Sequence, residues 1–305
     1  MPPLVNYDSP QALRAFLDER GLGMRKRHGQ NFLISSSVRT KLLDALDFSS
    51  GDSVWEIGPG LGAMTTGLLE RRAKVTAFEI DPAFAKALTS FFSNDTDPAC
   101  RFNLIQGDVL KTWQDTASTF TNHKAKGEKL FLLGNLPYNI AAALIADFIE
   151  KGFYFFRSVI TVQREVAKRM CARPGSKDYS SFSVLCSSVY KLTPLALIKP
   201  ASFYPAPRVD SQAVRMDILP PRNLPKLFYP LVRSLFSSRR KTIRNTLSNF
   251  AVSVILKAGA EMSASDTARE VLKKAGIAAE ERPEKLGIDE FAALATFLED
   301  AISNG

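Results

Sequence analysis

Val54-Trp55-Glu56-Ile57-Gly58-Pro59-Gly60-Leu61-Gly62 is the stretch that decides the fold of this 305-residue chain. Its first four residues have the mostly apolar character of a strand, and residues 64–71, after the glycines, have the spacing of a helix. Glycine allows a sharp turn and a close approach to a ligand because it lacks a Cβ atom. The helix that follows offers unpaired N–H groups suited to an anionic group. The stretch therefore predicts a strand, a ligand-binding turn and a helix in succession.

The same alternation continues along the chain. Residues 74–80 predict a strand, and Asp81 opens a helix predicted over residues 82–92. Strands that alternate with helices are typical of a parallel sheet covered on both faces. We therefore expect an α/β fold, with further strands at residues 102–106, 130–133 and 158–162 and a polar surface loop at 112–129.

The composition changes after Asp217. Three prolines interrupt the chain there, and the residues that follow have helical spacing without a strand pattern. We expect two domains: residues 1–218, with the sheet and a basic N-terminal segment, and residues 219–305, a small helical domain.

The chain is basic, with 40 Lys and Arg against 31 Asp and Glu and a net charge of +9. Residues 20–41 hold six basic residues and residues 232–250 hold five, and neither stretch contains an acid. A short charge run is usually a solvated surface. Two fields of one sign, however, repel themselves unless a partner neutralises them, which favours nucleic acid. The candidate phosphate contacts are Arg25, Lys26, Arg27, Arg239, Arg240, Lys241 and Arg244.

Other classes of protein are excluded by composition. A hydrophobic content of 45% excludes a disordered or fibrous chain. The three cysteines are too far apart for a disulfide framework or a metal-binding pair, so no metal is expected. No run approaches the ~18 apolar residues of a membrane span, and the N-terminus lacks the apolar core of a signal peptide. We expect a soluble cytoplasmic protein, and a monomer.

The glycine turn alone does not identify its ligand. Gly58, Gly60 and Ala63 have the spacing of a dinucleotide site, and Glu79 follows at about the 20 residues expected of an acid that holds ribose hydroxyls. A nicotinamide-dependent dehydrogenase and a protein with another adenosyl cofactor are therefore both open at this point.

Three further features favour S-adenosylmethionine. Glu56, just inside the turn, would repel a pyrophosphate but attract an ammonium group. Asp108, after the next strand, can accept a hydrogen bond from an adenine amino group. Residues 135–138 follow the strand after that. Each acid alone is equally well explained as a helix cap or turn residue, but their succession at strand ends fits a cofactor with a ribose, an adenine and an amino-acid end.

Asn135-Leu136-Pro137-Tyr138 has the groups needed to activate a nucleobase amine. The amine is a poor nucleophile because its lone pair is delocalised into the ring. The side-chain oxygen of Asn135 and a backbone carbonyl at Leu136 or Pro137 can accept its N–H groups and weaken that delocalisation, while Tyr138 stacks on the base. Transfer then depends on in-line approach at ~3–3.5 Å.

A base inside a duplex must leave its stack to reach such a pocket, and a second ring would sandwich it there. Phe203 and Tyr204 are the candidates for that ring. Packing of a proline-rich loop in the core explains these two aromatic residues equally well.

These motifs resemble those of the ribosomal RNA small-subunit adenine dimethyltransferases. The resemblance covers residues 25–249 and continues more loosely beyond. It is carried by Gly29-Gln30-Asn31-Phe32-Leu33, residues 56–62, Phe78-Glu79-Ile80-Asp81, Gly107-Asp108, residues 135–138, Gln163-Arg164-Glu165-Val166, residues 203–211 and residues 239–245.

The resemblance implies a Rossmann-like methyltransferase sheet with a helical C-terminal domain. It also implies transfer of two methyl groups to N6 of each of two adjacent adenines, in the hairpin near the 3′ end of small-subunit rRNA, with a role in the biogenesis of the 30S ribosomal subunit. By resemblance, Asn31 and Leu33 would contact the methionine end of the cofactor, Gly58 would lie beside it, and Asn135 would lie between the cofactor and the amine. Glu79 would hold the ribose and Asp108 the adenine, and Gly60 and Ile80 complete the predicted set.

Two positions depart from the family pattern. His28 stands where many relatives have an aromatic residue, and Val166 stands where some have phenylalanine, so a stacking partner is absent there. Two alternatives remain: an Erm-like methylase of large-subunit rRNA, and a non-catalytic assembly or RNA-binding factor on the same fold.

Overall fold

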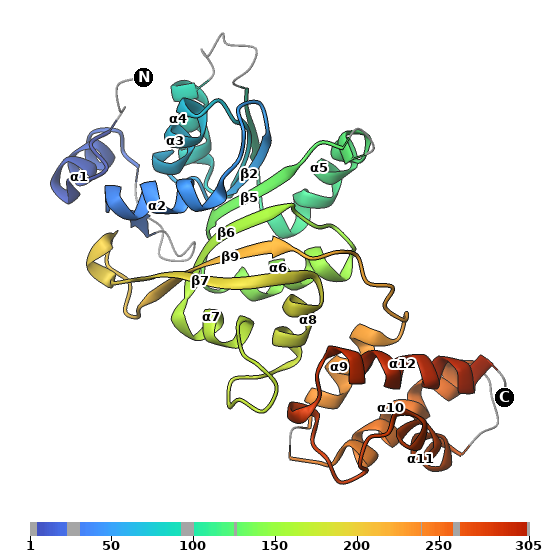
Figure 1. The fold of residues 1–305 in the computed structure, drawn as a ribbon. Coiled ribbons are helices and arrows are strands. Elements are labelled where there is room, and N and C mark those ends of the chain that lie inside the picture. The colour runs from blue at the N-terminus through green and yellow to red at the C-terminus, as the bar shows by residue number, and fades with distance from the viewer. Residues whose placement is uncertain are drawn as a thin grey trace. The chain divides into compact units, whose positions relative to one another are not determined.

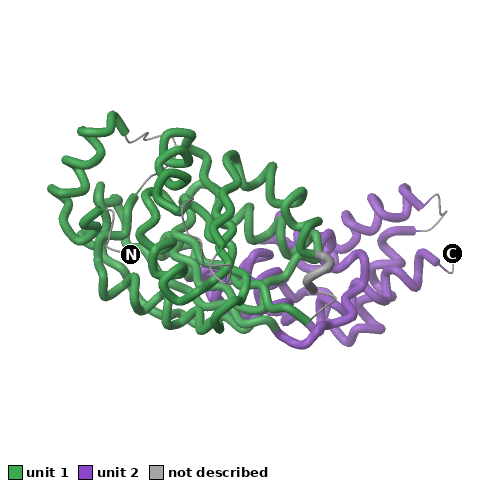
Figure 2. Tube along the Cα trace, turned by 90° about the horizontal axis from the view of Figure 1, so that it is seen from above, with its two compact units in different colours: residues 1–167, 191–218 green, residues 168–190, 219–305 purple. Residues whose placement is uncertain are grey.

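The computed structural model describes residues 5–22, 31–92, 101–124, 127–238, 240–258 and 263–303. Contacts divide the chain into two compact units (Figure 2). Unit 1 comprises Met1–Ala167 and Lys191–Ile218, and unit 2 comprises Lys168–Tyr190 and Leu219–Gly305. Residues 219–305 thus fall in one unit, as their helical pattern suggests, but residues 168–190 group with them. That residues 1–218 and 219–305 are separate domains stays a prediction.

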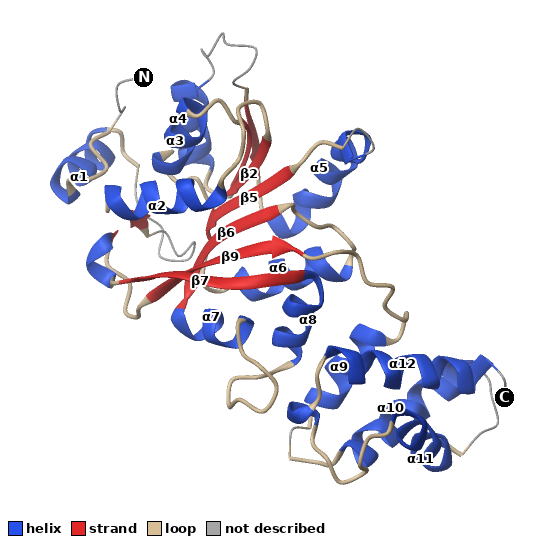
Figure 3. Cartoon of the chain, in the orientation of Figure 1, coloured by secondary structure: helices blue, strands red, loops and turns tan. Residues whose placement is uncertain are grey.

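A seven-stranded sheet forms the centre of unit 1. Its strand order is β4-β3-β2-β5-β6-β9-β7, and Figure 3 shows most of these strands side by side. The first five are parallel, and β9 is antiparallel to β6. The predicted parallel sheet with α/β alternation is confirmed. The strands are β2 (Ser53–Ile57), β3 (Lys74–Glu79), β4 (Phe102–Gln106), β5 (Leu130–Asn135), β6 (Arg157–Gln163), β7 (Tyr190–Ile198) and β9 (Ser211–Ile218).

Strand β2 is buried along its whole length because helices cover both faces of the sheet (Figure 1). Val54 points to one face, where it joins a core cluster with apolar residues of α2, α3 and α4. Trp55 points to the other face and is fully buried among aromatic rings, with Phe153 stacked at 5.0 Å between centroids. The helices of unit 1 beside the sheet are α2 (Ser36–Leu46), α3 (Ala63–Glu70), α4 (Pro82–Phe92), α5 (Val109–Lys124) and α6 (Ala141–Glu150), and α7 (Arg164–Met170) crosses the unit boundary.

The prediction of a surface loop over residues 112–129 is wrong for residues 112–124, which belong to α5. Trp113 is 2% exposed, and Phe120 lies edge-on to Trp55 with 5.6 Å between the ring centroids. These two aromatic residues and Ala117 recur at helical spacing and bury one face of α5. The many polar residues between them occupy the other face of the helix, which is why the stretch resembled a loop.

Helix α1 (Pro10–Glu19) and a separate two-stranded sheet complete unit 1. The helix begins at Ser9, whose side chain accepts a hydrogen bond from the Ala12 N–H. Strand β1 (Phe32–Leu33) pairs antiparallel with β8 (Phe203–Tyr204), so that Leu33 lies opposite Phe203. Leu33 therefore lies in a short strand pair directly before α2.

Unit 2 is helical. Its core gathers apolar residues such as Leu231, Leu247 and Phe291 around the buried Tyr179, whose hydroxyl donates to the Leu286 carbonyl at 2.9 Å. No helix in the described part of the chain is long and apolar enough to cross a membrane. The elements wholly within this unit are α8 (Ser181–Val189), α9 (Phe228–Phe236), α10 (Ile243–Ala258), α11 (Ala264–Ala275), the short helix η3 (Pro283–Lys285) and α12 (Ile288–Ser303).

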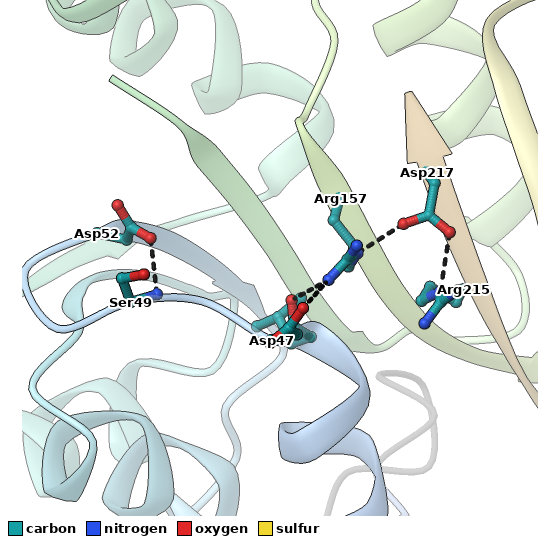
Figure 4. Close-up of polar contacts among 7 residues, drawn as sticks. Asp47, Ser49, Asp52, Arg157, Arg215 and Asp217 are labelled. Atoms are coloured by element: carbon teal, nitrogen blue, oxygen red, sulfur yellow. Dashed lines mark hydrogen bonds and ion pairs between the residues drawn. The ribbon is translucent and has the colours of Figure 1, made fainter. Parts of the chain in front are cut away.

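Arg157 joins α2 to the sheet at the amino end of β6 (Figure 4). Its guanidinium donates to Asp217 on β9 at 2.6 Å and to Asp47 at the end of α2 at 2.8 Å. Arg215 donates to the other Asp217 oxygen at 2.8 Å. Burial disfavours the charge on Arg157, but the hydrogen bonds to Asp217 and Asp47 outweigh it and raise the pKa of Arg157. The network therefore depends on the partly buried guanidinium of Arg157, which is bonded to two carboxylates.

We predict that Arg157→Met lowers the free energy of unfolding of unit 1 by about 1–3 kcal/mol, because it leaves the partly buried Asp217 with one cation. Asp47→Asn should lower it by less than about 1 kcal/mol, since the Asp47 side chain is 77% exposed. Both tryptophans lie in unit 1, so urea unfolding followed by tryptophan fluorescence reports this unit. Equal losses from the two substitutions would contradict this ranking.

Candidate active site

The parallel register brings the ends of neighbouring strands to one edge of the sheet. Ile57 lies opposite Phe78 on one side and Gly134 on the other, so that the residues after them, Gly58, Glu79 and Asn135, start from the same level. A cavity of about 220 Å³ opens there. Ten of the predicted site residues line this cavity, namely Asn31, Leu33, Glu56, Gly58, Gly60, Glu79, Ile80, Asp108, Asn135 and Pro137.

The glycine turn forms one wall of the cavity. Gly58 and Gly60 have φ angles of 70° and 60°, a region that residues with a side chain rarely adopt. The Gly58 N–H donates to the Phe78 carbonyl at 3.0 Å, and this bond ties the turn to β3. A Cβ on Gly60 would lie only 2.9 Å from the Phe32 ring, which lines the cavity. Glycine is therefore required both by the turn and by the closeness of β1.

Glu79 ends β3 with its carboxylate in the wall of the cavity. One oxygen accepts the Gly60 N–H at 3.1 Å and the other accepts the Asp81 N–H at 2.9 Å. The residue is 4% exposed, and this burial outweighs the hydrogen bonds and raises the pKa of Glu79 to about 7. The site therefore holds a carboxylate that takes up a proton near neutral pH unless a ligand favours its ionised form.

Glu56 is a second buried carboxylate at the cavity. It is 2% exposed and accepts a hydrogen bond from the Thr65 hydroxyl at 2.6 Å. Burial again outweighs this bond and raises the pKa of Glu56 to about 7. Sequence reasoning selected Glu56 but missed Thr65, although Thr65 lies in the first turn of α3, directly after the glycines.

Asp108 lies after β4, where it caps a helix and also lines the cavity. One carboxylate oxygen accepts the Leu110 N–H at 3.1 Å at the beginning of α5, while the residue also lines the cavity. The capping role that was one explanation for this acid is thus present together with its position at the site. Ile80, beside it in the wall, is 43% exposed, which leaves an apolar surface open at this end of the cavity.

The side chain of Asn135 has a fixed orientation. Its Nδ2 atom donates to the backbone carbonyl of Asn31 at 2.8 Å. Because the amide nitrogen is used in this way, the Oδ1 atom is directed away from the Asn31 carbonyl. The next residue, Leu136, is buried and its N–H donates to the Thr161 carbonyl at 3.0 Å, while Pro137 lines the cavity. The backbone after β5 is therefore held against β6.

The two predicted stacking residues differ in their surroundings. Tyr138 is half-buried, and its hydroxyl is 2.7 Å from the Ser211 Oγ atom at the start of β9. Phe203 is 3% exposed and belongs to the same core cluster as Leu33. A base could stack on Phe203 only after the ring turned out of this cluster, so core packing accounts for its present position. Its stacking role stays a prediction.

The predicted RNA contacts are only partly described. Arg25, Lys26, Arg27 and Arg239 lie outside the described residues, as does His28. The remaining three, Arg240, Lys241 and Arg244, are exposed in unit 2. Among the residues that the structure describes, no group of three or more His, Cys, Asp or Glu could hold a metal ion.

Three known proteins with the same name are similar to this chain over nearly its whole length. Ribosomal RNA small subunit methyltransferase A of Treponema denticola is 40% identical over 301 residues, which cover 97% of this chain and 96% of that protein. The protein of the same name from Treponema pallidum is 41% identical and covers 96% of this chain and 97% of its own length. That of Borreliella burgdorferi is 38% identical, with coverage of 96% and 95%.

Two solved structures share the fold. A dimethyladenosine transferase from Plasmodium falciparum has a TM-score of 0.72 at 23% identity, over 87% of this chain and 96% of that one. The 23S rRNA methyltransferase ErmE has a TM-score of 0.58 at 19% identity, over 88% and 99%. The expected Rossmann-like methyltransferase fold is thereby confirmed. A family model described as Ribosomal RNA adenine dimethylase matches residues 21–296. Because this model and the relatives span nearly the whole sequence, the chain belongs to the ribosomal RNA adenine dimethylase family.

Proposed function

We propose that the protein transfers methyl groups from S-adenosylmethionine to N6 of two adjacent adenines, two to each, in the hairpin near the 3′ end of small-subunit rRNA. Membership of the family gives the reaction class, adenine dimethylation in ribosomal RNA. The names of the relatives support the small subunit as the source of the substrate. The observation that carries the proposal is the cavity in which the glycine turn, Glu79, Asp108 and Asn135 converge.

The cavity fits the chemical groups of the cofactor. We assign Glu79 to the ribose hydroxyls, since each carboxylate oxygen has a second lone pair besides the one used by a backbone N–H. Asp108 would accept a hydrogen bond from the amino group of the adenine, and the exposed apolar surface of Ile80 would pack against the adenine ring. Glu56 would attract the ammonium group, and Asn31, Leu33, Gly58 and Gly60 would enclose the methionine end. When bound, S-adenosylmethionine supplies an electrophilic methyl group on its sulfonium.

Asn135 would orient the adenine amine for attack. Its Nδ2 atom is held by the Asn31 carbonyl, so Oδ1 is the atom available to accept an N–H of the amine. A backbone carbonyl at Leu136 or Pro137 would accept the second N–H. With both N–H groups held, the lone pair on the nitrogen is directed toward the methyl group, and positioning supplies most of the rate acceleration. After transfer the amine is acidic, and its proton passes to water.

Tyr138 would stack on the flipped adenine. Its ring orientation is supported by the Ser211 contact, which connects it to a strand of the central sheet. Phe203 is the second candidate, which would have to leave its core cluster. The exposed Arg240, Lys241 and Arg244, together with Arg25, Lys26, Arg27 and Arg239, would contact RNA phosphates. We further propose that the protein acts as a cytoplasmic monomer on the 30S ribosomal subunit and contributes to its biogenesis.

Reaction with unmodified small subunits tests the proposed function. Purified protein and labelled S-adenosylmethionine should methylate small-subunit particles that lack the modification, and mapping should locate the label on two adjacent adenines near the 3′ end. Label only on large-subunit RNA would support the Erm-like alternative. Binding to small subunits without any transfer would support a non-catalytic assembly factor, and binding of nicotinamide cofactors in a titration would support a dehydrogenase.

We predict that Asn135→Ala lowers the rate of methyl transfer by about 10²–10³-fold at saturating cofactor, since a positioned hydrogen-bonding group is lost. RNA affinity, measured by filter binding, should change by less than about threefold. The matched control is Asn103→Ala, an exposed asparagine on β4 outside the cavity, which should keep the rate of the unaltered protein. An unchanged rate for Asn135→Ala would remove this side chain from the mechanism.

The affinity for S-adenosylmethionine should fall as the pH drops below about 7. In the free protein the pKa of Glu79 is about 7, and only the ionised carboxylate accepts hydrogen bonds from both ribose hydroxyls. Cofactor binding should therefore release protons, and each linked proton raises Kd up to tenfold per pH unit below the pKa. Calorimetry between about pH 5.5 and 8.5 measures this dependence.

Glu79→Gln separates the contribution of this residue from that of Glu56, whose pKa is also about 7. The variant should bind the cofactor more weakly above pH 7, and its log Kd should depend on pH with a slope lower by up to one. Titration of the cofactor itself is common to both proteins and cancels. The same slope in both proteins would exclude Glu79 as the titrating group.

A further inference from the structure

Residues 5–22 form a compact cap on the glycine turn, although the family model begins only at residue 21. Val5, Tyr7, Leu13, Leu17 and Leu22 are buried in one cluster with Leu61 of the turn and Phe84 of α4. Phe32 of β1 packs against this cluster, and its ring meets Phe84 edge-on with 5.6 Å between centroids. The N-terminal residues therefore share a core with both segments that flank the cofactor cavity.

Tyr7 connects this cap directly to the glycine turn. The residue is 7% exposed, and its hydroxyl donates to the Leu61 carbonyl at 2.8 Å. Leu61 is itself 1% exposed, so water does not replace this partner easily. Burial raises the pKa of Tyr7 to about 12, so the hydroxyl keeps its proton and remains a donor at neutral pH.

Arg39 connects the same cap to β1. Its guanidinium donates to the Leu33 carbonyl at 2.9 Å and to the Asp8 carboxylate at 2.7 Å, and its side chain is 12% exposed. It also lies over the Tyr7 ring, with 5.8 Å between the guanidinium carbon and the ring centroid. Arg39 thus holds Asp8, Tyr7 and Leu33 in one arrangement from its place on α2.

We propose that Tyr7 and Arg39 are positioning residues for cofactor binding, which hold the glycine turn and β1 at the separation that S-adenosylmethionine requires. The inference rests on the proposed cofactor site. Leu61 lies between the cavity-lining Gly60 and the first residue of α3, and Leu33 of β1 also lines the cavity. If these walls move, only a fraction of the molecules has the binding-competent spacing, and the apparent Kd rises in inverse proportion to that fraction.

Tyr7→Phe tests this inference because it removes one oxygen atom and keeps the ring. We expect the Kd for S-adenosylmethionine, measured by calorimetry, to rise about tenfold, with kcat at saturating cofactor and KM for the RNA substrate unchanged. Arg39→Lys should have a comparable effect, since an ammonium group does not span both acceptors as a guanidinium does. Asp8→Asn, at an exposed position, should weaken binding about two- to threefold without endangering the fold.

Asp18→Asn is the matched control. Asp18 lies on the outer face of α1, its side chain is 74% exposed and pairs with Arg14, and the substitution should leave Kd unchanged. The inference would be overturned if Tyr7→Phe, Arg39→Lys and Asp8→Asn bound the cofactor as tightly as the unaltered protein. The same holds if these variants lowered only the melting temperature and left the affinity unchanged. If the unaltered protein itself fails to bind S-adenosylmethionine, the proposed function is wrong. Titration of the unaltered protein alone shows this, so that failure is distinguished from a failure of the inference about Tyr7 and Arg39.

Discussion

The backbone turn at residues 58–62 is the constraint on which the rest of the site depends. Its positive φ angles direct the chain sharply from β2 into α3, and this conformation leaves backbone groups that need partners. Phe78 accepts from Gly58, Glu79 accepts from Gly60, and Tyr7 donates to Leu61. The turn is thus held from β3 on one side and from the N-terminal cap on the other.

The same edge of the sheet contains two carboxylates in an unfavourable environment. Glu56 and Glu79 are almost fully buried, and for both the pKa is raised to about 7 because burial outweighs their hydrogen bonds. A site that buries two acids near a cavity is stabilised by a ligand with an ammonium group and hydroxyl donors. The proposed cofactor carries both, an ammonium group at its methionine end and hydroxyls on its ribose, so the electrostatics and the family likeness agree.

Much of the site could be predicted because a parallel sheet gathers residues from consecutive strand ends. Gly58, Glu79, Asp108 and Asn135 are far apart in the chain, but each lies at or just after the end of a strand that the apolar pattern marks, and the register brings them to one edge. Phe203 shows where this reasoning stops. Its motif is explained equally well by a stacking ring and by core packing, and in the structure β8 pairs with β1 and Phe203 lies in the core cluster. The surface-loop prediction over residues 112–129 failed because few apolar residues mark the inner face of α5, and only the fold shows that Trp113 and Ala117 are buried and that Phe120 lies against Trp55.

The sequence by itself determined the sheet, the glycine turn and the acids of the site, because glycine conformation and strand or helix periodicity are short-range properties. Only the tertiary structure decided which side chains hold these parts in place. Tyr7 and Leu61 are 54 residues apart, Tyr138 and Ser211 are 73 apart, and Asn135 and Asn31 are 104 apart. Each pair is joined by a single hydrogen bond between common chemical groups, and no local sequence pattern indicates which residue is the partner of which. The folded sheet and the packing of residues 5–22 on it bring these groups within reach.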